Sequence, residues 1–149
     1  NAKATIDGNV VWNSMGTTPG RVKDVIGIGV SSISSINNHY FQNFYELNEY
    51  EEALNNGRFP HYRGYTMSED DILRRDIIQS LRNYASADVK DIHYFKSEFE
   101  TLKAFELDNL VLVSGTSITI LEKEYSNLVC RVFDKFYTGE HFAPDLGER

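Results

Sequence analysis

Glycines and hydroxyls are concentrated in one short stretch, from Asp24 to Asn37, which reads DVIGIGVSSISSIN. Large aliphatic residues alternate there with Gly27 and Gly29, a pattern that predicts a strand with one face bare of side chains. Glycine inside a strand usually marks the close approach of a ligand or of another backbone. The bare face is therefore a candidate contact surface, and a tight packing crossover is the alternative interpretation.

The residues around these glycines add a second signal. The other face of the expected strand carries Ile26, Ile28 and Val30. The hydroxyls that follow belong to Ser31, Ser32, Ser34 and Ser35, with Ile33 among them. Hydroxyls and N–H groups at the place where a chain leaves a strand can bind the polar part of a ligand.

Other catalytic patterns are scarce. The histidines lack the HExxH spacing of zinc proteases, and no Gly-x-Ser-x-Gly elbow is present. They are therefore expected at the surface or half-buried; they are His39, His61, His93 and His141. The one cysteine, Cys130, lies in an apolar helical pattern, so it is expected in the core, with neither a disulfide framework nor a metal-ligand spacing.

A cluster of charges occurs on a segment with helical periodicity. Asp70 and Asp71 each precede an arginine, Arg74 or Arg75, by four residues, which is the favourable order for ion pairs within a helix. A solvated charged face is one interpretation. The other is that Arg74, Arg75 and Asp76 dock a neighbouring domain or anionic groups.

Helices are expected to position these groups. Apolar residues recur at helical spacing from Phe44 to Leu54, before a glycine-containing stop. A second helix is expected to begin after Ser68, an N-cap with Asp71 three residues on, and to continue to about Tyr84.

A third helix, a hairpin and a fourth helix follow. The third is expected after Ser97, where SEFE resembles a capping box. Its inward-facing residues are expected to be Phe95, Phe99, Leu102 and Phe105. A β-hairpin is expected over residues 110–121, and a last helix from about Glu122 to Tyr137. This order of elements is close to that of a winged helix.

The charge of the chain argues against nucleic-acid binding. The formal net charge is −7, and the expected third helix carries three glutamates against two lysines. Phosphate binding requires the opposite sign. A winged-helix-like module with this charge is expected to pack against protein instead.

Length and composition indicate a globular chain. Its 149 residues are 41% hydrophobic, which is enough to build a core. No apolar run approaches the ~20 residues that cross a bilayer, and no signal peptide is recognisable, so a cytoplasmic location without a membrane partner is expected. The first residue is not methionine, and residues 1–2 are typical of a cleaved tag, so a domain of a longer protein is expected.

Several motifs, in this order, resemble one enzyme family. They are DVIGIGVSSISSI, YFQN at 40–43, LNEYEEAL at 47–54, YRGYTMSEDDILRRDIIQSL at 62–81, and FD at 133–134. Together they closely resemble the C-terminal part of the oxygen-independent coproporphyrinogen III oxidases (dehydrogenases) of haem biosynthesis. The resemblance covers most of the chain from about Asn13 onward.

The resemblance implies radical S-adenosylmethionine chemistry in a full-length parent. In this family a [4Fe-4S] cluster and S-adenosylmethionine drive the oxidative decarboxylation of two propionates of coproporphyrinogen III to vinyls, which gives protoporphyrinogen IX. The cluster needs three cysteine ligands from a C-x-x-x-C-x-x-C motif that is absent here. The fragment alone is therefore expected to bind no cofactor and to hold no catalytic residue.

The resemblance also suggests cofactor-binding residues. The family isoleucine that matches Ile33 lies by a second S-adenosylmethionine, and NSMGTTP at 13–19 resembles a family pattern that would place Met15 near it. The implied cofactor-binding residues are Met15, Gly27, Gly29, Ser31 and Ile33. Two departures are notable, because Ser14 and Thr17 replace family aromatics and Asn127 and Leu128 stand where an R-N pair would fall.

These inferences predict an α+β chain with a mostly helical, winged-helix-like C-terminal domain that contains a β-hairpin. Residues 1–44 would form the closing edge of a radical S-adenosylmethionine barrel, 45–66 a helix and connector, 67–139 a winged-helix-like domain that covers the active site, and 140–149 a tail. The expected partners are the N-terminal radical domain of the same chain and coproporphyrinogen III or a related tetrapyrrole, in a monomer. The alternatives are a paralogue that handles haem or another tetrapyrrole, and a catalytically silent interaction module.

Overall fold

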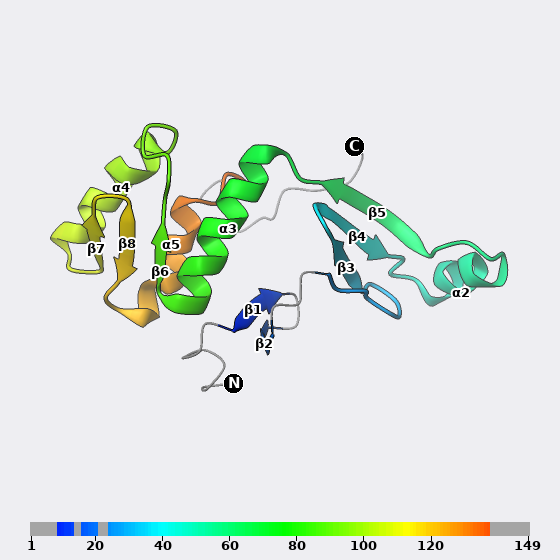
Figure 1. Cartoon of the computed structure of the whole chain (residues 1–149). Coiled ribbons are helices and arrows are strands. Elements are labelled where there is room, and N and C mark those ends of the chain that lie inside the picture. Colours follow the sequence, from blue (N-terminus) through cyan, green and yellow to red (C-terminus); the bar gives the residue numbers. More distant parts are fainter. Residues whose placement is uncertain (1–8, 14–15, 21–23, 138–149) are drawn as a thin grey trace. The chain divides into compact units, whose positions relative to one another are not determined.

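The computed structural model describes residues 9–13, 16–20 and 24–137 (Figure 1). Within these ranges the fold is α+β, as predicted, with four α-helices and small antiparallel sheets. In the described part of the expected C-terminal domain, residues 67–137, helices contribute more residues than strands, in agreement with the mostly helical domain expected there. The chain divides into two compact units, Arg21–Ile72 (unit 2) and Asn1–Gly20 with Leu73–Arg149 (unit 1).

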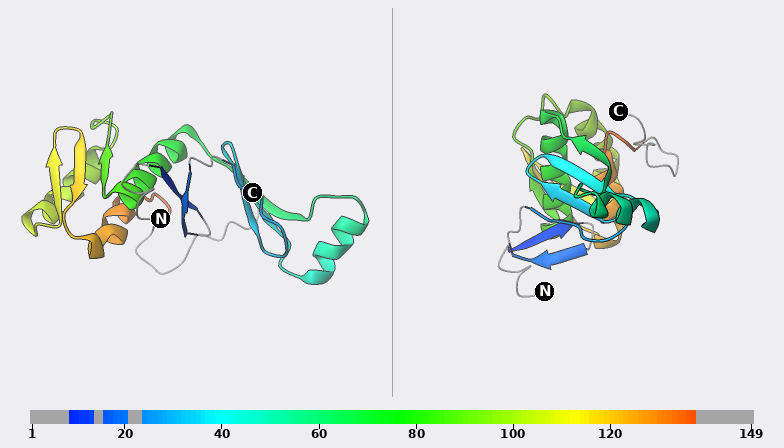
Figure 2. Two further views of the ribbon diagram at one scale, coloured as in Figure 1. Left: turned by 60° about the horizontal axis from the view of Figure 1, so that its bottom comes forward. Right: turned by 90° about the vertical axis from the view of Figure 1, so that its right-hand side faces the viewer.

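Unit 2 is built on a three-stranded antiparallel sheet in the order β3-β4-β5. A helix, α2, connects the second and third strands and lies beyond the end of the sheet (Figure 2). The elements are β3 (Ile33–Ile36), β4 (His39–Asn43), α2 (Leu47–Asn55) and β5 (His61–Thr66). Gly57, with a φ of 66°, follows the helix as predicted for a C-terminal stop.

Unit 1 contains a two-stranded sheet, a three-stranded sheet in the order β6-β8-β7, and three helices. Its elements are β1 (Val10–Asn13), β2 (Gly16–Pro19), most of α3 (Glu69–Tyr84), β6 (Ser86–Asp88), α4 (Lys96–Leu107), β7 (Val111–Ser114), β8 (Ser117–Ile120), a 3-10 helix (Lys123–Tyr125) and α5 (Ser126–Val132). The predicted hairpin is β7-β8, which turns at Gly115 with a φ of 60°.

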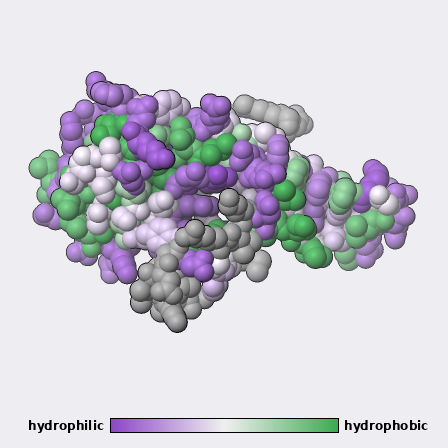
Figure 3. Space-filling view, in the orientation of Figure 1, coloured by the Kyte–Doolittle hydropathy of each residue, from purple (hydrophilic) through white to green (hydrophobic). Residues whose placement is uncertain are grey.

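One hydrophobic core holds unit 1 together. Its buried residues come from α3, α4, α5 and the three-stranded sheet, and they are Ile77, Leu81, Ala87, Val89, Phe95, Leu102, Val111, Ile118, Ile120, Val129, Cys130 and Phe133. Phe99 and Phe105 pack against this core, so the predicted inward face of the third helix is confirmed. Hydrophobic residues, green in Figure 3, also reach the surface of the molecule.

The start of α3 is the predicted capping box. The Ser68 hydroxyl accepts a hydrogen bond from the Asp71 N–H at 3.2 Å, and the Asp71 carboxylate accepts one from the Ser68 N–H at 2.8 Å. Asp71 also accepts a hydrogen bond from the Tyr65 hydroxyl at 2.6 Å. Reciprocal bonds of this kind satisfy N–H groups that a helix start leaves without intrahelical partners.

The structure corrects three helix predictions. The first helix begins at Leu47 rather than Phe44, and it buries Ala53 while Leu47 and Leu54 are exposed. The third begins at Lys96, so its N-cap is Phe95, whose side chain has no hydrogen-bond acceptor. Ser97 lies inside the helix, where its hydroxyl donates to the Glu98 carboxylate at 2.7 Å.

The last helix is shorter than predicted. Instead of a helix from about Glu122 to Tyr137, a 3-10 turn leads into α5, which ends at Val132. The apolar periodicity of the sequence did not predict that the helix ends at Val132. Strand β6 was also missed, because three residues are too few to show an alternation.

The stretch that opens unit 2 is a further correction. Residues 24–32 do not form the predicted strand, and their one ladder contact is the isolated bridge between Val25 and Ser35. Ile26 and Ile28, expected on one face of that strand, are 73% and 86% exposed. The alternating sequence therefore belongs to a loop that leads into β3.

Candidate functional site

The loop before β3 is held against the sheet of unit 2 by backbone contacts. Val25 and Ser35 exchange two hydrogen bonds of 2.7 and 2.8 Å. Ser31 donates its N–H to the Phe44 carbonyl at 2.8 Å. These bonds attach the loop at both of its ends, so the residues between them have a defined path over β3 and β4.

Gly27 has no side chain because its neighbours leave no room for one. A Cβ at this position would lie 2.8 Å from the Ile33 carbonyl oxygen and 2.8 Å from the Ser32 Cβ. Contacts that short essentially never occur, and the atoms in the way include backbone. Atoms of this chain itself therefore exclude a side chain at Gly27. This favours tight packing within the chain, rather than direct ligand contact, as the reason for the glycine.

Gly29 and Ser31 turn the chain. Their φ angles of 99° and 56° are in the region that L residues adopt rarely, which a strand cannot accommodate. The Gly29 N–H donates to the Tyr50 hydroxyl on α2 at 3.1 Å. The Ser31 carbonyl accepts a hydrogen bond from the Gln42 side chain at 3.1 Å.

Two buried polar side chains complete the attachment. Asn43, which is 3% exposed, donates from its amide to the carbonyls of Gly29 at 2.8 Å and Gly27 at 3.3 Å. The Ser34 hydroxyl, also buried, accepts the N–H of Gly27 at 3.0 Å. A buried amide that satisfies two loop carbonyls makes the loop part of the folded structure rather than a mobile connection.

One cross-strand row lies beside this loop. Ile33 on β3 pairs with Gln42 on β4, and Gln42 pairs with Arg63 on β5. The Gln42 carbonyl oxygen accepts a hydrogen bond from Arg63 Nε at 2.9 Å. Ile33 is 40% exposed. Since all three residues occupy one row across the sheet, an aliphatic group, an amide and a guanidinium are presented together.

The residues that the resemblance implied as cofactor-binding residues have different surroundings. Ile33 and Ser31 are exposed, Gly27 and Gly29 shape the loop, and Met15 lies outside the described residues. Thr17, where the family has an aromatic residue, is an exposed residue of β2. The described part of the site therefore consists of the loop and the row that it borders.

Sequence reasoning gave no role to three residues that build this region. Gln42 and Asn43 were noticed only as part of the YFQN motif, and nothing in the sequence indicated that Asn43 would bind the loop carbonyls. Arg63 was not singled out. Its signal was a single cation in the middle of a tyrosine-rich strand, HYRGYT.

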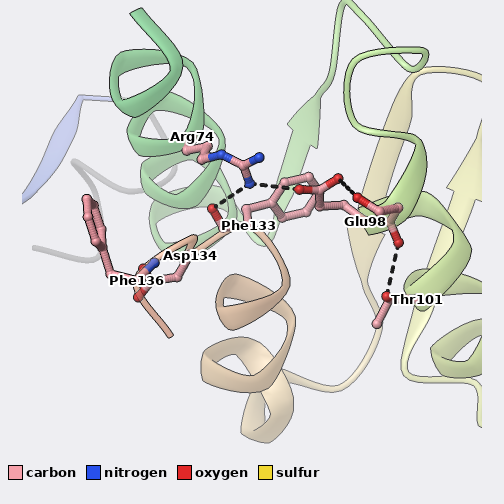
Figure 4. Close-up of polar contacts among 7 residues, drawn as sticks. Arg74, Glu98, Thr101, Phe133, Asp134 and Phe136 are labelled. Carbon is pink, nitrogen blue, oxygen red and sulfur yellow. Dashed lines mark hydrogen bonds and ion pairs between the residues drawn. The ribbon is translucent and has the colours of Figure 1, made fainter. Parts of the chain in front are cut away.

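Arg74 belongs to a separate cluster, inside unit 1 (Figure 4). Its Nη1 donates to Glu98 Oε1 at 2.8 Å and to the Phe133 carbonyl at 3.3 Å, and its guanidinium carbon lies 5.2 Å from the Phe95 ring centroid. Arg74 therefore links α3 to α4 and to the end of α5. Its side chain is only 17% exposed, so the solvated charged face does not include Arg74, and the acid that it pairs with lies within its own unit.

Titration of Glu98 reflects this environment. Burial by itself raises the pKa of Glu98, but the hydrogen bonds from Ser97 and Arg74 and the charge of Arg74 outweigh burial, and the pKa lies below its ordinary value of 4.5. The carboxylate is therefore ionised near neutral pH and completes an ion pair.

Cysteine and histidine occur where the sequence predicts them. Cys130 is buried in the core of unit 1, and burial raises the pKa of its thiol. His39, His61 and His93 are exposed, whereas His141 lies outside the described residues. Within the described part of the chain, no three histidine, cysteine, aspartate or glutamate side chains converge as a metal site would require. No helix of that part is long and apolar enough to cross a bilayer.

The chain is similar to known enzymes over nearly its whole length. It is 32% identical over 146 residues to the oxygen-independent coproporphyrinogen III oxidase of Pseudomonas aeruginosa, covering 91% of this chain and 32% of that protein. It is 35% identical over 147 residues to the enzyme of Helicobacter pylori, covering 90% of this chain and 32% of that protein. No family model matches the chain.

A solved structure gives the same result. The chain superposes on coproporphyrinogen III oxidase (HemN) from Escherichia coli, described as a radical SAM enzyme, with a TM-score of 0.84 and 29% identity. The match covers 91% of this chain and 34% of that one. The chain spans about a third of the length of the curated relatives that it matches. In both sequence and fold, this chain is thus homologous to a segment that makes up about one third of the length of the oxygen-independent coproporphyrinogen III oxidases.

Proposed function

We propose that this chain is the C-terminal part of an oxygen-independent coproporphyrinogen III oxidase. Such an enzyme converts two propionates of coproporphyrinogen III to vinyl groups by oxidative decarboxylation, giving protoporphyrinogen IX. The observation that carries the proposal is the match to the Escherichia coli enzyme, with a TM-score of 0.84 over 91% of this chain. A match that extends across both units supports common ancestry of the whole segment rather than of one motif.

Three segments of the chain have different proposed parts in this enzyme. Residues 1–44 are proposed to form the closing edge of the catalytic barrel, 45–66 a helix and connector, and 67–139 a winged-helix-like domain. The order α3, β6, α4, β7, β8 and α5, with a β-hairpin before the last helix, supports the winged-helix-like description. The exposed Ile26 and Ile28 support contact with the rest of a longer cytoplasmic enzyme, since large aliphatic groups seldom stay uncovered together.

The loop before β3 is the proposed wall of the cofactor and substrate site. Ile33 is proposed to contact S-adenosylmethionine directly, because its aliphatic side chain is 40% exposed at the edge of the sheet. Gly27, Gly29 and Ser31 are proposed to act through the backbone, by shaping the loop that carries Ile33 to this place. Met15 is proposed as a further contact on the basis of sequence alone.

The radical chemistry would depend on residues outside this chain. A [4Fe-4S] cluster in this family needs three cysteine ligands, and the chain has one cysteine, Cys130, in the core of unit 1. The residues present therefore do not fit the cluster. What this chain can contribute is a surface for the cofactor and the substrate.

The test is anaerobic turnover of coproporphyrinogen III by the full-length enzyme that carries this chain, with S-adenosylmethionine and a reductant. Formation of protoporphyrinogen IX is the expected result. Cleavage of S-adenosylmethionine without that product would overturn the substrate assignment and indicate a paralogue. Absence of cleavage by a reconstituted, cluster-containing protein would overturn the enzyme assignment and leave an interaction module.

A further inference from the structure

Within the described part of the chain, neutral groups hold the guanidinium of Arg63 in place. Its Nε donates to Gln42 Oε1 at 2.9 Å, and its Nη2 donates to the Tyr45 hydroxyl at 2.9 Å. The same Gln42 oxygen also accepts the Tyr45 O–H at 2.9 Å. Both acceptors belong to unit 2, so the orientation of the guanidinium is set by its own unit.

The charge of Arg63 has no partner among the residues that the structure describes. No carboxylate of the described chain pairs with it, whereas Arg74, Arg75 and Lys103 each pair with an acid. Acidic groups are abundant in a chain of net charge −7, so the neutral surroundings of Arg63 do not reflect a shortage of carboxylates. The neutral partners therefore orient the cation without neutralising it.

The remaining hydrogen-bonding capacity of Arg63 points to one kind of ligand. Nε and Nη2 share the side edge of the planar guanidinium, and that edge is occupied by Gln42 and Tyr45. The end edge, which includes Nη1, makes no hydrogen bond within the described residues. This edge has the geometry to bind both oxygens of a carboxylate at once.

Two aromatic rings lie near the guanidinium. The guanidinium carbon lies 6.0 Å from the ring centroids of both Tyr45 and Tyr62, which are 48% and 52% exposed. Ile33 lies two strands away in the same row, at a backbone separation of about 10 Å. A ligand that carries carboxylates on the rim of an apolar ring matches this arrangement.

We propose that Arg63 binds a propionate carboxylate of the tetrapyrrole substrate, with its end edge donating to both carboxylate oxygens and the two tyrosines contacting the ring. The assignment rests on the proposed function, since the substrate class comes from there. It goes further by naming the substrate-binding residue and the substrate group. Gln42 and Tyr45 are the positioning residues of this site.

The test measures binding rather than turnover, in the full-length enzyme that carries this chain. The probes are coproporphyrin III, the fluorescent oxidised form of the substrate, and its tetramethyl ester, which lacks carboxylates. Arg63→Gln removes the charge, Arg63→Lys keeps the charge without the planar fork, and Arg58→Gln makes the same charge change at an exposed arginine of the same unit. Binding of S-adenosylmethionine is measured in parallel.

The expected result is specific to the acid. Arg63→Gln should weaken coproporphyrin III binding by about 10- to 100-fold, the range for a hydrogen-bonded charge pair, and leave ester binding unchanged. Arg63→Lys should weaken acid binding by a smaller factor, because a single point charge replaces the fork. Arg58→Gln and S-adenosylmethionine binding should be unaffected.

Other outcomes overturn the inference in recognisable ways. Equal loss for the acid and the ester would show that Arg63 shapes the fold rather than binding a carboxylate, and the free energy of unfolding of Arg63→Gln would fall with it. A loss confined to S-adenosylmethionine would assign the carboxylate to that cofactor. Unchanged acid binding would remove Arg63 from the site while the proposed function stands. A wild-type enzyme that binds no coproporphyrin would instead contradict the proposed function itself.

Discussion

The Arg74 guanidinium on α3 lies 2.8 Å from the Glu98 carboxylate on α4, and the two side chains are only 17% and 10% exposed. The same nitrogen reaches the Phe133 carbonyl at the end of α5. One side chain thus joins three helices of unit 1 across the edge of its hydrophobic core (Figure 4). Ion pairs with so little exposure respond strongly to the loss of one partner.

Arg74→Met should therefore destabilise the chain by about 2–4 kcal/mol, because it leaves the Glu98 carboxylate buried without its cation. The free energy of unfolding in urea measures this loss. Lys103→Met, which breaks the exposed pair with Glu100, is the matched control and should change stability little. Similar losses for the two variants would contradict a special role for Arg74.

Stability should also fall with acidification through Glu98. The pKa of Glu98 in the folded chain lies below its ordinary value of 4.5. The unfolded chain therefore binds a proton more readily, so the contribution of Glu98 is complete above the ordinary pKa and is lost as the pH falls through the folded value. Urea unfolding at a series of pH values between about 6 and 3 measures the loss. Glu98→Gln should show a shallower dependence, and an unchanged slope would count against this assignment.

Gly27→Ala should distort the loop before β3. The new Cβ would meet the Ile33 carbonyl and the Ser32 Cβ at 2.8 Å, so the loop must move away from β3. Hydrogen exchange at the Ser35 amide, which donates to Val25, should accelerate as that bridge is lost. Gly57→Ala is the control, since Gly57 has open space around it and adds only local backbone strain. Normal protection of Ser35 in Gly27→Ala would show that the loop tolerates a side chain.

Asn43→Ala should cost about 1–3 kcal/mol, because the carbonyls of Gly27 and Gly29 would lose their buried donor. Urea unfolding of the 149-residue chain is the measurement. Asn56→Ala removes a comparable amide-to-carbonyl bond, but an exposed one on α2, and should cost no more than about 0.5 kcal/mol. An equal decrease in the free energy of unfolding for the two variants would contradict a special role of Asn43 in holding the loop.

Local structure could be predicted from the sequence where the sequence pattern and the contacts that it forms involve the same few residues. Ser68 and Asp71 lie within one helical turn, so the capping box and the start of α3 could be predicted from spacing alone. The hairpin β7-β8 was predictable for the same reason, because the glycine turn and both strands are adjacent. The motifs of the loop and of YFQN likewise sufficed to indicate the related enzymes.

Period-two alternation misled the reading of residues 24–30. Alternating aliphatics and glycines predict a strand, but the φ angles of Gly29 and Ser31 turn the chain out of one. The local sequence does not predict that Asn43 donates a hydrogen bond to a carbonyl of this loop, or that Ser34 accepts one from a loop N–H. Contacts between residues five or more positions apart decided its conformation.

The sequence alone determined the start of α3 at its capping box and the turn of the β7-β8 hairpin at Gly115, because those preferences act over a few neighbouring residues. Tertiary structure decided the rest. It paired Arg74 with Glu98 rather than with solvent, and it placed Arg63 beside Gln42 and Tyr45 in one row with Ile33. These partners come from different elements, and the energy of burying or orienting a charge depends on groups that only the folded chain brings together.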